Sequence, residues 1–271
     1  MTRTVLITGC SSGIGRATAE AFLEDEWTVW ATARDEDDLT ALAEAGAETA
    51  ELDVTNAREC ERVVEQATDE EPLDCLVNNA GISQRGAVEE IPTERLHHQL
   101  DVNLYGPHRL IRAALPGMRR AGEGRIVNVS SVVQRVSPPG SGAYAASKAA
   151  LESLSDALRA EVEGEGIEVV QVEPGPVATE FEATARESLR DVDRTGTYEW
   201  LYDAYEDAQD VGRGPLSVPP EAVAETIRDA ACASDPATRY PVGQVAKLAG
   251  LAAHLPDRWR DAVVGLLRSV A

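Results

Sequence analysis

The feature that most constrains the fold is a regular alternation between short apolar runs and longer amphipathic segments. The apolar runs have few charges, as expected of strands that are covered on both faces. They begin at Val5, Val29, Leu76, Ile126 and Val169. Segments of helical length and spacing lie between them, for example over 16–26, 36–45 and 58–68. Strands that alternate with helices form parallel sheets with right-handed crossovers. The sequence therefore predicts the α/β class, with a doubly wound parallel sheet and helices on both faces.

The balance of charges excludes several classes of partner. The 271 residues include 47 Asp plus Glu against 25 Lys plus Arg, which gives a formal net charge of −22. Nucleic-acid binding requires a basic surface, so we expect no nucleic-acid partner. No uncharged run approaches the roughly 20 residues that a membrane helix needs, and the first apolar run is too short for a signal peptide. We expect a cytoplasmic protein without a membrane partner.

The cationic residues are almost all arginines. Lys148 and Lys247 are the only lysines in the sequence. An acidic surface with little lysine suits concentrated salt, where screening weakens the repulsion between like charges. Our hypothesis is a halophilic source with a salt-rich cytoplasm, and an ordinary acidic cytosolic protein is the alternative.

A glycine-rich loop directly follows the first apolar run. It reads Thr8-Gly9-Cys10-Ser11-Ser12-Gly13-Ile14-Gly15, and a predicted helix comes next. Glycines allow a tight turn and a close approach of backbone to phosphate, while the start of a helix supplies free N–H donors. Taken by themselves, the glycines would also be explained by an ordinary tight turn. Their position between a strand and a helix is typical of dinucleotide binding.

The end of the second predicted strand indicates which dinucleotide is bound. An acidic residue about 20 positions after the glycines binds the ribose 2′-hydroxyl of NAD, whereas a nearby arginine accommodates the 2′-phosphate of NADP. This sequence has Ala33 followed by Arg34. Because guanidinium geometry matches phosphate well, we favour NADP(H) over NAD(H). A solvated arginine that balances the acidic residues 35–37 is the alternative.

A tyrosine and a lysine lie four residues apart in Tyr144-Ala-Ala-Ser-Lys148. At the start of a helix, this spacing places the phenol and the ammonium on one face. A free tyrosine has a pKa of about 10, too high for ready proton exchange near neutrality. We expect the nearby cation to lower that pKa and make Tyr144 a general acid or base.

An ordered set of motifs resembles the short-chain dehydrogenase/reductase family over residues 1 to about 180. Besides the glycine loop and the Tyr-Lys pair, the set comprises Asp53-Val54, Asn78-Asn-Ala-Gly81, Asn103, Ser130-Ser131 and Pro174-Gly-Pro-Val-Ala-Thr179. The resemblance implies a Rossmann-type fold and an NAD(P)-dependent oxidoreductase that acts on CH–OH or C=O groups. It also implies that the cofactor supplies the hydride while the protein orients it.

The resemblance implies four catalytic residues. Tyr144 exchanges a proton with the substrate oxygen, and Ser131 hydrogen-bonds the same oxygen. Lys148 lowers the tyrosine pKa and contacts the nicotinamide ribose, while Asn103 holds a water in the proton relay. Ser130 fits the spacing less well than Ser131.

The resemblance also implies a set of cofactor-binding residues. Asp53 and Val54 flank the adenine, and Val177 and Thr179 hold the carboxamide. Asn79 and its neighbours support the adenosine side or, as asparagine amides often do, mainly tie the loops together. The full set is Thr8, Gly9, Ser11, Ser12, Gly13, Ile14, Gly15, Arg34, Asp53, Val54, Asn79, Ala80, Gly81, Tyr144, Lys148, Pro174, Gly175, Val177 and Thr179.

One residue departs from the family pattern. The family commonly has glycine three residues after the catalytic serine, and this chain has Gln134. The larger side chain either narrows the substrate pocket, offers the substrate a hydrogen bond, or faces solvent from a loop.

The regular alternation breaks at Pro174-Gly-Pro and resumes near Pro219. We predict a single domain over 1–271, with a cofactor-binding and catalytic core over 1–180, a substrate lid over 180–218, and C-terminal helices with the last strand over 219–271. The lid contains five of the chain's aromatic residues, Phe181, Tyr198, Trp200, Tyr202 and Tyr205. Aromatic pocket walls predict a fairly bulky, apolar alcohol or ketone. Packing of the lid on the core would also explain these residues.

We predict no metal site. The cysteines are Cys10, Cys60, Cys75 and Cys232, with no C-x-x-C spacing, and we interpret them as buried reduced thiols. The histidines have no ligand spacing with cysteines or carboxylates. We interpret His97-His98 as a polar helix face.

Two other functions are compatible with such a scaffold. A nucleotide-sugar epimerase or dehydratase usually has a longer C-terminal substrate domain and a different glycine spacing. A non-catalytic dinucleotide sensor has no need of the four catalytic residues together. We therefore favour the oxidoreductase. The resemblance further implies a homodimer or homotetramer built on helices over 103–120 and 144–161.

Overall fold

Seven strands form one sheet in the computed structural model, which describes residues 2–69, 72–207, 214, 216–252, 256 and 258–259. The strands are β1 (Thr4–Thr8), β2 (Thr28–Ala33), β3 (Glu48–Glu51), β4 (Cys75–Asn78), β5 (Gly124–Val129), β6 (Ile167–Pro174) and β7 (Arg239–Val242). Their order is β3-β2-β1-β4-β5-β6-β7, and all neighbours are parallel. The predicted doubly wound α/β fold is therefore confirmed.

The strand order reverses between β1 and β4, at the centre of the sheet. Val5 of β1 pairs with Val29 of β2 on one side and with Cys75 of β4 on the other. The chain builds outward to β3 and then returns across β1 to form the second half. A crevice opens beyond the carboxyl ends of the strands at such a reversal. The loops that follow β1 and β4 therefore define the place of the site.

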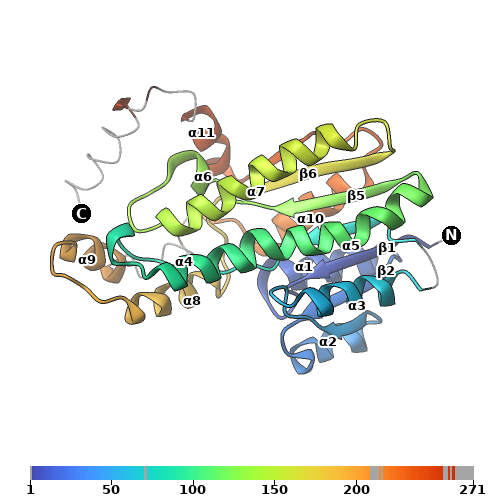
Figure 1. Cartoon of the computed structure of the whole chain (residues 1–271), viewed down its shortest axis with the longest axis horizontal. Coiled ribbons are helices and arrows are strands. Elements are labelled where there is room, and N and C mark those ends of the chain that lie inside the picture. Colours follow the sequence, from blue (N-terminus) through green and yellow to red (C-terminus); the bar gives the residue numbers. More distant parts are fainter. Residues whose placement is uncertain are drawn as a thin grey trace.

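Helices cover both faces of the sheet. They include α1 (Gly13–Glu24), α3 (Ala57–Ala67), α4 (Thr93–Leu100), α5 (Gly106–Ala121), α6 (Val133–Val136), α7 (Gly142–Glu161) and α10 (Pro220–Cys232). Val5 and Ile7 of β1 pack in one buried cluster with side chains of α1 and α10, whereas Leu6 packs in another with α3, α5 and α7. Figure 1 shows α5 and α7 in front of the sheet and α10 behind it. No helix in the described ranges is both long and apolar enough to span a membrane.

The β3 edge of the sheet differs most from the sequence-based expectation. We did not predict β3, because Ala50 is its only fully buried residue and the run is too polar to stand out. The segment predicted as a helix over 36–45 divides into a 3-10 turn, η1 (Glu36–Leu39), and α2 (Thr40–Glu44). At the other edge, β7 is followed by α11 (Gln244–Ala252).

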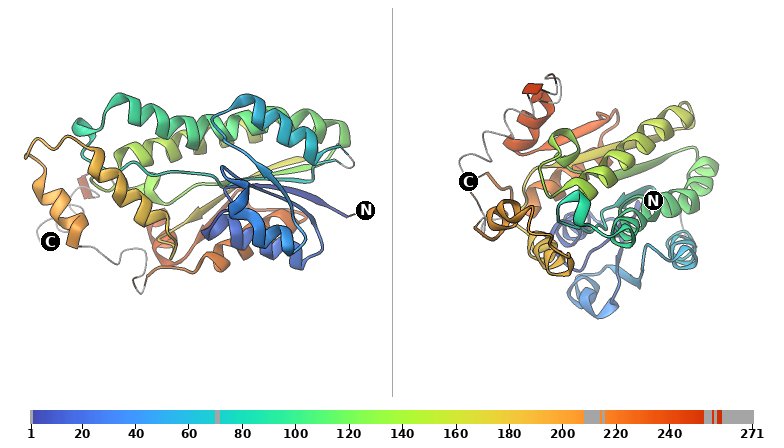
Figure 2. Two further views of the ribbon diagram at one scale, coloured as in Figure 1. Left: turned by 90° about the horizontal axis from the view of Figure 1, so that it is seen from below. Right: turned by 60° about the vertical axis from the view of Figure 1, so that its left-hand side comes forward.

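Three short helices follow the core at Thr179. They are α8 (Phe181–Glu187), η4 (Ser188–Asp191) and α9 (Glu199–Asp207). Figures 1 and 2 show α8 and α9 beyond the carboxyl ends of the strands. This segment, which we call the lid, leaves and rejoins the core at one neck. There, Val218 N donates to Pro176 O at 2.9 Å, and Ala178 N donates to Val218 O at 3.0 Å.

A buried carboxylate fastens the lid to the core. Glu90 lies in η2 (Val88–Glu90) and accepts a hydrogen bond from the hydroxyl of Tyr202 on α9. The same carboxylate accepts from the backbone N and the hydroxyl of Thr195, at 2.6 and 2.7 Å. Because Tyr202 is fully buried, its hydroxyl depends on this acceptor.

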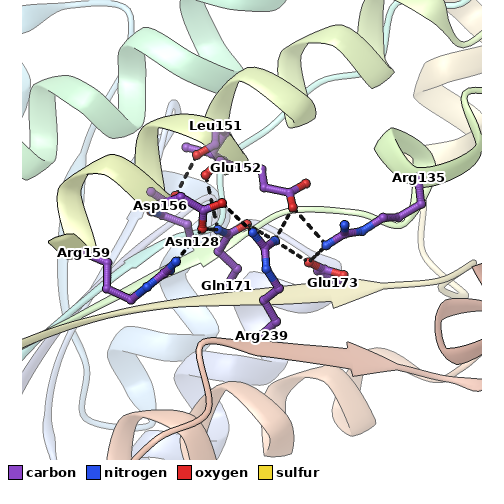
Figure 3. Close-up of polar contacts among 10 residues, drawn as sticks. Asn128, Arg135, Leu151, Glu152, Asp156, Arg159, Gln171, Glu173 and Arg239 are labelled. Carbon is purple, nitrogen blue, oxygen red and sulfur yellow. Dashed lines mark hydrogen bonds and ion pairs between the residues drawn. The ribbon is translucent and has the colours of Figure 1, made fainter. Parts of the chain in front are cut away.

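A cluster of ion pairs joins α6, α7, β6 and β7 (Figure 3). Arg239 of β7 pairs with Glu173 at 3.0 Å, with Asp156 at 2.7 Å, and with Glu152. Arg135 of α6 pairs with Glu152 and Glu173, each at 2.9 Å. The Glu173 side chain is only 6% exposed, so its charge needs these partners. The cluster fixes the last two strands against α7.

Candidate active site

The loop between β1 and α1 forms a cradle of backbone at the carboxyl edge of the sheet. Gly9 and Gly13 have φ angles of +74° and +55°, which side chains rarely tolerate. A Cβ at Gly15 would overlap the carbonyl oxygen of Gly9, and a Cβ at Gly13 would lie 3.0 Å from Cγ2 of Thr179. The glycines thus keep space at the start of α1, where free N–H groups and the helix dipole favour phosphate. This cradle fits the pyrophosphate of a dinucleotide.

Side chains behind the cradle tie it to the loop that follows β4. The Thr8 hydroxyl accepts from the backbone N of Asn79 and of Ala80, both at 3.0 Å. The Asn79 amide donates to the carbonyls of Thr8 and Gly9, at 2.8 and 3.1 Å. The side chain of Asn79 therefore joins the two loops at the strand-order reversal.

A cleft of about 630 Å³ extends from the cradle to the lid. The predicted residues that line it are Gly9, Ser11, Ser12, Gly13, Ile14, Arg34, Asp53, Val54, Asn79, Ala80, Gly81, Ser131, Tyr144, Lys148, Pro174, Gly175, Val177 and Thr179. Thr8, Gly15 and Asn103 are buried and lie outside this lining. They support the site from behind.

Arg34 lines the cleft just after β2. Within the described part of the chain, its guanidinium has no hydrogen bond or ion pair. Two of the acidic residues that follow it are engaged elsewhere. Asp35 accepts from Asp37 N at 3.1 Å, and Glu36 accepts from the Thr49 hydroxyl at 2.9 Å. The guanidinium is thus available to an anion bound in the cleft.

Tyr144 and Lys148 lie in the first two turns of α7. Both side chains line the cleft and are buried, with 8% and 4% of the residue exposed. The ammonium of Lys148 donates to the carbonyl of Val129 at 2.8 Å and lies 5.8 Å from the centre of the Tyr144 ring. The phenol and the ammonium therefore share one side of the helix, toward the glycine-lined crevice.

The pKa of Tyr144 moves in the direction opposite to our expectation. Burial raises it to about 12, although hydrogen bonding with Ser131 and the charge of Arg85 act to lower it. Burial also lowers the pKa of Lys148 to about 8. The prediction of a lowered tyrosine pKa is wrong in this structure, because desolvation of the phenolate outweighs the nearby positive charge. At neutral pH Tyr144 is a phenol that can donate a proton.

Asn103 lies in a π-helical turn, η3 (Asp101–Tyr105), between α4 and α5. Its Oδ1 accepts from Ile82 N and its Nδ2 donates to Ile82 O, both at 2.9 Å. The Nδ2 also donates to the Ser147 hydroxyl at 3.0 Å, and that hydroxyl donates to the carbonyl of Tyr144 at 2.8 Å. Single π turns are frequent at functional sites. Here the turn lets one side chain join the loop after β4 to α7.

The substrate side of the cleft contains residues that the sequence analysis missed. The guanidinium carbon of Arg85 lies 5.8 Å from the ring centres of both Tyr144 and Tyr205. Arg85 donates to the Ser141 hydroxyl and pairs with Glu182 of α8 at 3.2 Å. All of these residues line the cleft. A partly buried ion pair therefore joins Arg85, beside Tyr144, to α8 of the lid.

The aromatic residues of the lid differ in their surroundings. Phe181 packs on Tyr144 with ring centres 5.7 Å apart, and both Phe181 and Tyr205 line the cleft. Tyr202 instead packs in a buried cluster within the lid, and both Tyr198 and Tyr205 lie against that cluster. The expected aromatic lining is thus provided by Phe181 and Tyr205, whereas Tyr198 and Tyr202 serve packing.

Two smaller expectations need correction, at Cys232 and Gln134. The His97-His98 pair is exposed on α4, as expected of a polar helix face, and His98 also lines the cleft. Cys232 is exposed, whereas the other three free thiols are buried. The Gln134 amide is buried without a hydrogen-bond partner in the described chain and lies outside the cleft lining, so it neither faces solvent nor enters the pocket. Within the same ranges, no cluster of metal-ligating side chains is present.

Comparison with known proteins agrees with this geometry. Residues 3–190 match the family model described as short chain dehydrogenase. The uncharacterized oxidoreductase YbbO of Escherichia coli is 36% identical over 246 residues, which cover 89% of this chain and 86% of that protein. The NADPH-dependent 3-dehydrocapnine reductase of Ornithobacterium rhinotracheale is 31% identical over 275 residues, with 96% and 95% covered. A crystal structure of a short-chain dehydrogenase from Streptomyces avermitilis has a TM-score of 0.81 at 33% identity, with 99% and 97% covered. The chain belongs to the short-chain dehydrogenase/reductase family of oxidoreductases.

Proposed function

We propose that this protein is an NADP(H)-dependent oxidoreductase that transfers hydride between nicotinamide and a mainly apolar alcohol or ketone. The observation that carries this proposal is the convergence of Ser131, Tyr144 and Lys148 with the backbone cradle in one cleft. When bound, the cofactor supplies or accepts the hydride. The chain itself binds and orients both reactants and moves one proton.

In the reducing direction, the proton comes from the Tyr144 phenol. Burial keeps this phenol protonated at neutral pH, so it can donate to the substrate oxygen as that oxygen gains negative charge. The Ser131 hydroxyl bonds the same oxygen. Lys148 then returns a proton to the Tyr144 oxygen. Asn103, which is fixed by its contacts with Ile82, holds the water of the proton relay.

The preference for NADP(H) is supported by Arg34. Its guanidinium lines the cleft without a partner among the residues that the structure describes, and arginine suits the 2′-phosphate that distinguishes NADP from NAD. The similarity to a relative named as NADPH-dependent points the same way.

The walls of the substrate side support an apolar, fairly bulky substrate. They include the side chains of Val133, Val136, Pro138, Phe181 and Tyr205. Such walls favour a substrate whose body is buried through hydrophobic contact, while a few polar groups fix its orientation.

We further propose that the protein works as a homodimer or homotetramer in a salt-rich cytoplasm. The net charge of −22 supports the salt requirement, since screening is needed to bring acidic surfaces together. The helices expected to form the interface are α5 and α7. Light scattering at molar and at low salt tests both statements, and a fully active monomer in dilute buffer would contradict them.

The decisive experiment is a panel of ketones and alcohols assayed in molar salt with NADPH and NADH, using Tyr144→Phe as the control variant. We expect faster reduction with NADPH and a loss of about 10²–10⁴ in kcat for the variant, as is typical for a lost general acid. The Kd for NADPH should change by no more than about threefold, since the variant loses a single hydroxyl, and the unfolding temperature should stay unchanged. An unchanged kcat would remove Tyr144 from the chemistry.

A further inference from the structure

We propose that Arg85 forms an anion-binding subsite at the substrate end of the cleft, and that Glu182, which pairs with it in this structure, gives way to the anion. The substrate is then an apolar ketone or alcohol with a carboxylate or similar acidic group at a distance from the reacting carbon. This inference rests on the proposed function, because it names the class of substrate for the same site.

Arg85 is an unusual residue for its surroundings. It is the only charged residue between Cys75 and Val88, and 9% of its surface is exposed. Burying a guanidinium is costly unless it is paired and fully hydrogen-bonded. A charge in such a place indicates a task that an apolar side chain could not perform.

The hydrogen bonding of Arg85 is incomplete. Its Nη1 donates to the Ser141 hydroxyl, while Nη2 alone contacts both carboxylate oxygens of Glu182 at 3.2 Å. Charge-assisted N–H···O bonds are normally about 2.7–2.9 Å long. The buried Nε has no hydrogen-bond partner in the described residues. The Nε–Nη2 edge, which best matches a carboxylate, is therefore only half used.

A substrate carboxylate can complete this edge. Two parallel bonds, to Nε and Nη2, would replace the single-nitrogen contact that Glu182 makes. Glu182 is the more exposed partner of the pair, at 28% of its side chain against 10% for Arg85. Because it lies on α8 of the lid, it can turn toward solvent when an anion takes its place.

The position of Arg85 suits recognition of one end of a substrate. Its guanidinium carbon lies 5.8 Å from the ring centre of Tyr144, whose phenol acts at the reacting oxygen. Phe181 and Tyr205 flank the same part of the cleft. An apolar body of about the size of a substituted benzene ring would place its carbonyl at Tyr144 and its acidic group at Arg85.

The test compares two ketones of the same shape, 4-acetylbenzoate and the neutral 4-acetylbenzamide. We expect kcat/KM to favour the acid by at least about tenfold, as for a new pair of charge-assisted hydrogen bonds. Arg85→Ala should abolish the preference, and Arg85→Lys, which keeps the charge but not the fork, should restore part of it. Glu182→Gln should lower KM for the acid by a larger factor than KM for the amide, because it removes the internal competitor of the carboxylate.

Binding measured by calorimetry, with NADP⁺ present so that the ketones are not reduced, separates this inference from the proposed function. If neither ketone is reduced but the acid binds through Arg85, the proposed reaction fails and the subsite stands. Equal affinity for acid and amide in the wild type and in Arg85→Ala would overturn the subsite. A Glu182→Gln variant that raises KM for both ketones equally would show that the ion pair only closes the lid, and this too would overturn it.

Discussion

The two ends of the cleft are built from different kinds of contact. The cradle is formed mainly by backbone. It consists of glycines at positive φ and N–H groups at the start of α1, and an asparagine bonds to its main-chain carbonyls. The lid end is formed by side chains, since Arg85 contacts Ser141, Glu182 and Tyr205 from three other segments. A site made of backbone suits a group that many ligands share, such as pyrophosphate. In a site made of side chains, each substitution can change which ligand is bound.

This difference explains why family members can share a cofactor cradle and still differ in substrate. Positions such as Gly15 tolerate no Cβ, because the neighbouring backbone cannot move away. The lid, by contrast, is held on Glu90 by a few polar contacts. Single substitutions should separate the two ends, since a change at the cradle is expected to weaken cofactor binding and a change at the lid is expected to weaken substrate binding.

The largest effect is expected at the cradle. Gly15→Ala places a Cβ against the carbonyl of Gly9, so the loop must shift and the Kd for NADPH should rise by about 100-fold or more. Fluorescence titration with NADPH measures this directly. Gly117→Ala in α5 is the matched control, because only the end of the Arg120 side chain lies within 4 Å of its Cβ. Unchanged NADPH affinity in Gly15→Ala would show that this close approach is not needed for binding.

The next effect should change cofactor choice and not binding as a whole. Arg34→Ala should lower the ratio of kcat/KM for NADPH over NADH by about 30-fold, the effect of losing charge-assisted bonds to one phosphate. Values for NADH should stay within about twofold, since NAD lacks that phosphate. A ratio that does not change would assign Arg34 to the solvated surface.

A smaller effect, confined to the other end, is expected from Glu90→Ala. The change removes the acceptor for Tyr202 and Thr195, so the lid should dock less firmly and KM for the ketone rise about tenfold. The Kd for NADPH should not move. Glu89→Ala is the control, because Glu89 is exposed and, among the described residues, bonds only the Tyr198 hydroxyl at the surface. Equal losses in both variants would argue against a special role for Glu90.

The smallest effect is a pH dependence that arises from Tyr144 and Lys148, which lie on α7 and belong to neither end. Because burial lowers the pKa of Lys148 to about 8 and raises that of Tyr144 to about 12, only Lys148 loses its proton between pH 7 and 9. Reduction consumes a proton, so kcat for the ketone should fall by about fivefold between pH 7 and roughly pH 8.7, where about a sixth of Lys148 is still protonated. Oxidation of the alcohol should rise instead. A flat profile in both directions would exclude Lys148 from the proton path.

The same contrast sets the limit of prediction from sequence. The glycine loop, the Tyr144–Lys148 pair and the parallel sheet are encoded in short-range patterns, and the structure brings most of the predicted site residues to one cleft. Arg85 and Glu182 meet across 97 positions, and no local pattern predicts such a contact. The direction of the Tyr144 pKa shift does not follow from the sequence for a related reason. Burial of the phenol raises this pKa, and that burial depends on Phe181 of the lid as well as on α7.

The neck at Pro176–Ala178 and Val218 has a consequence for how such enzymes diversify. Its paired backbone bonds hold the departing and returning chain side by side, so whatever is inserted between them starts and finishes at the same point. Replacement by a loop of another length need not disturb the strands beneath. Recombination at this junction offers a simple route to new catalysts, with the hydride chemistry inherited intact and the choice of reactant supplied by the graft.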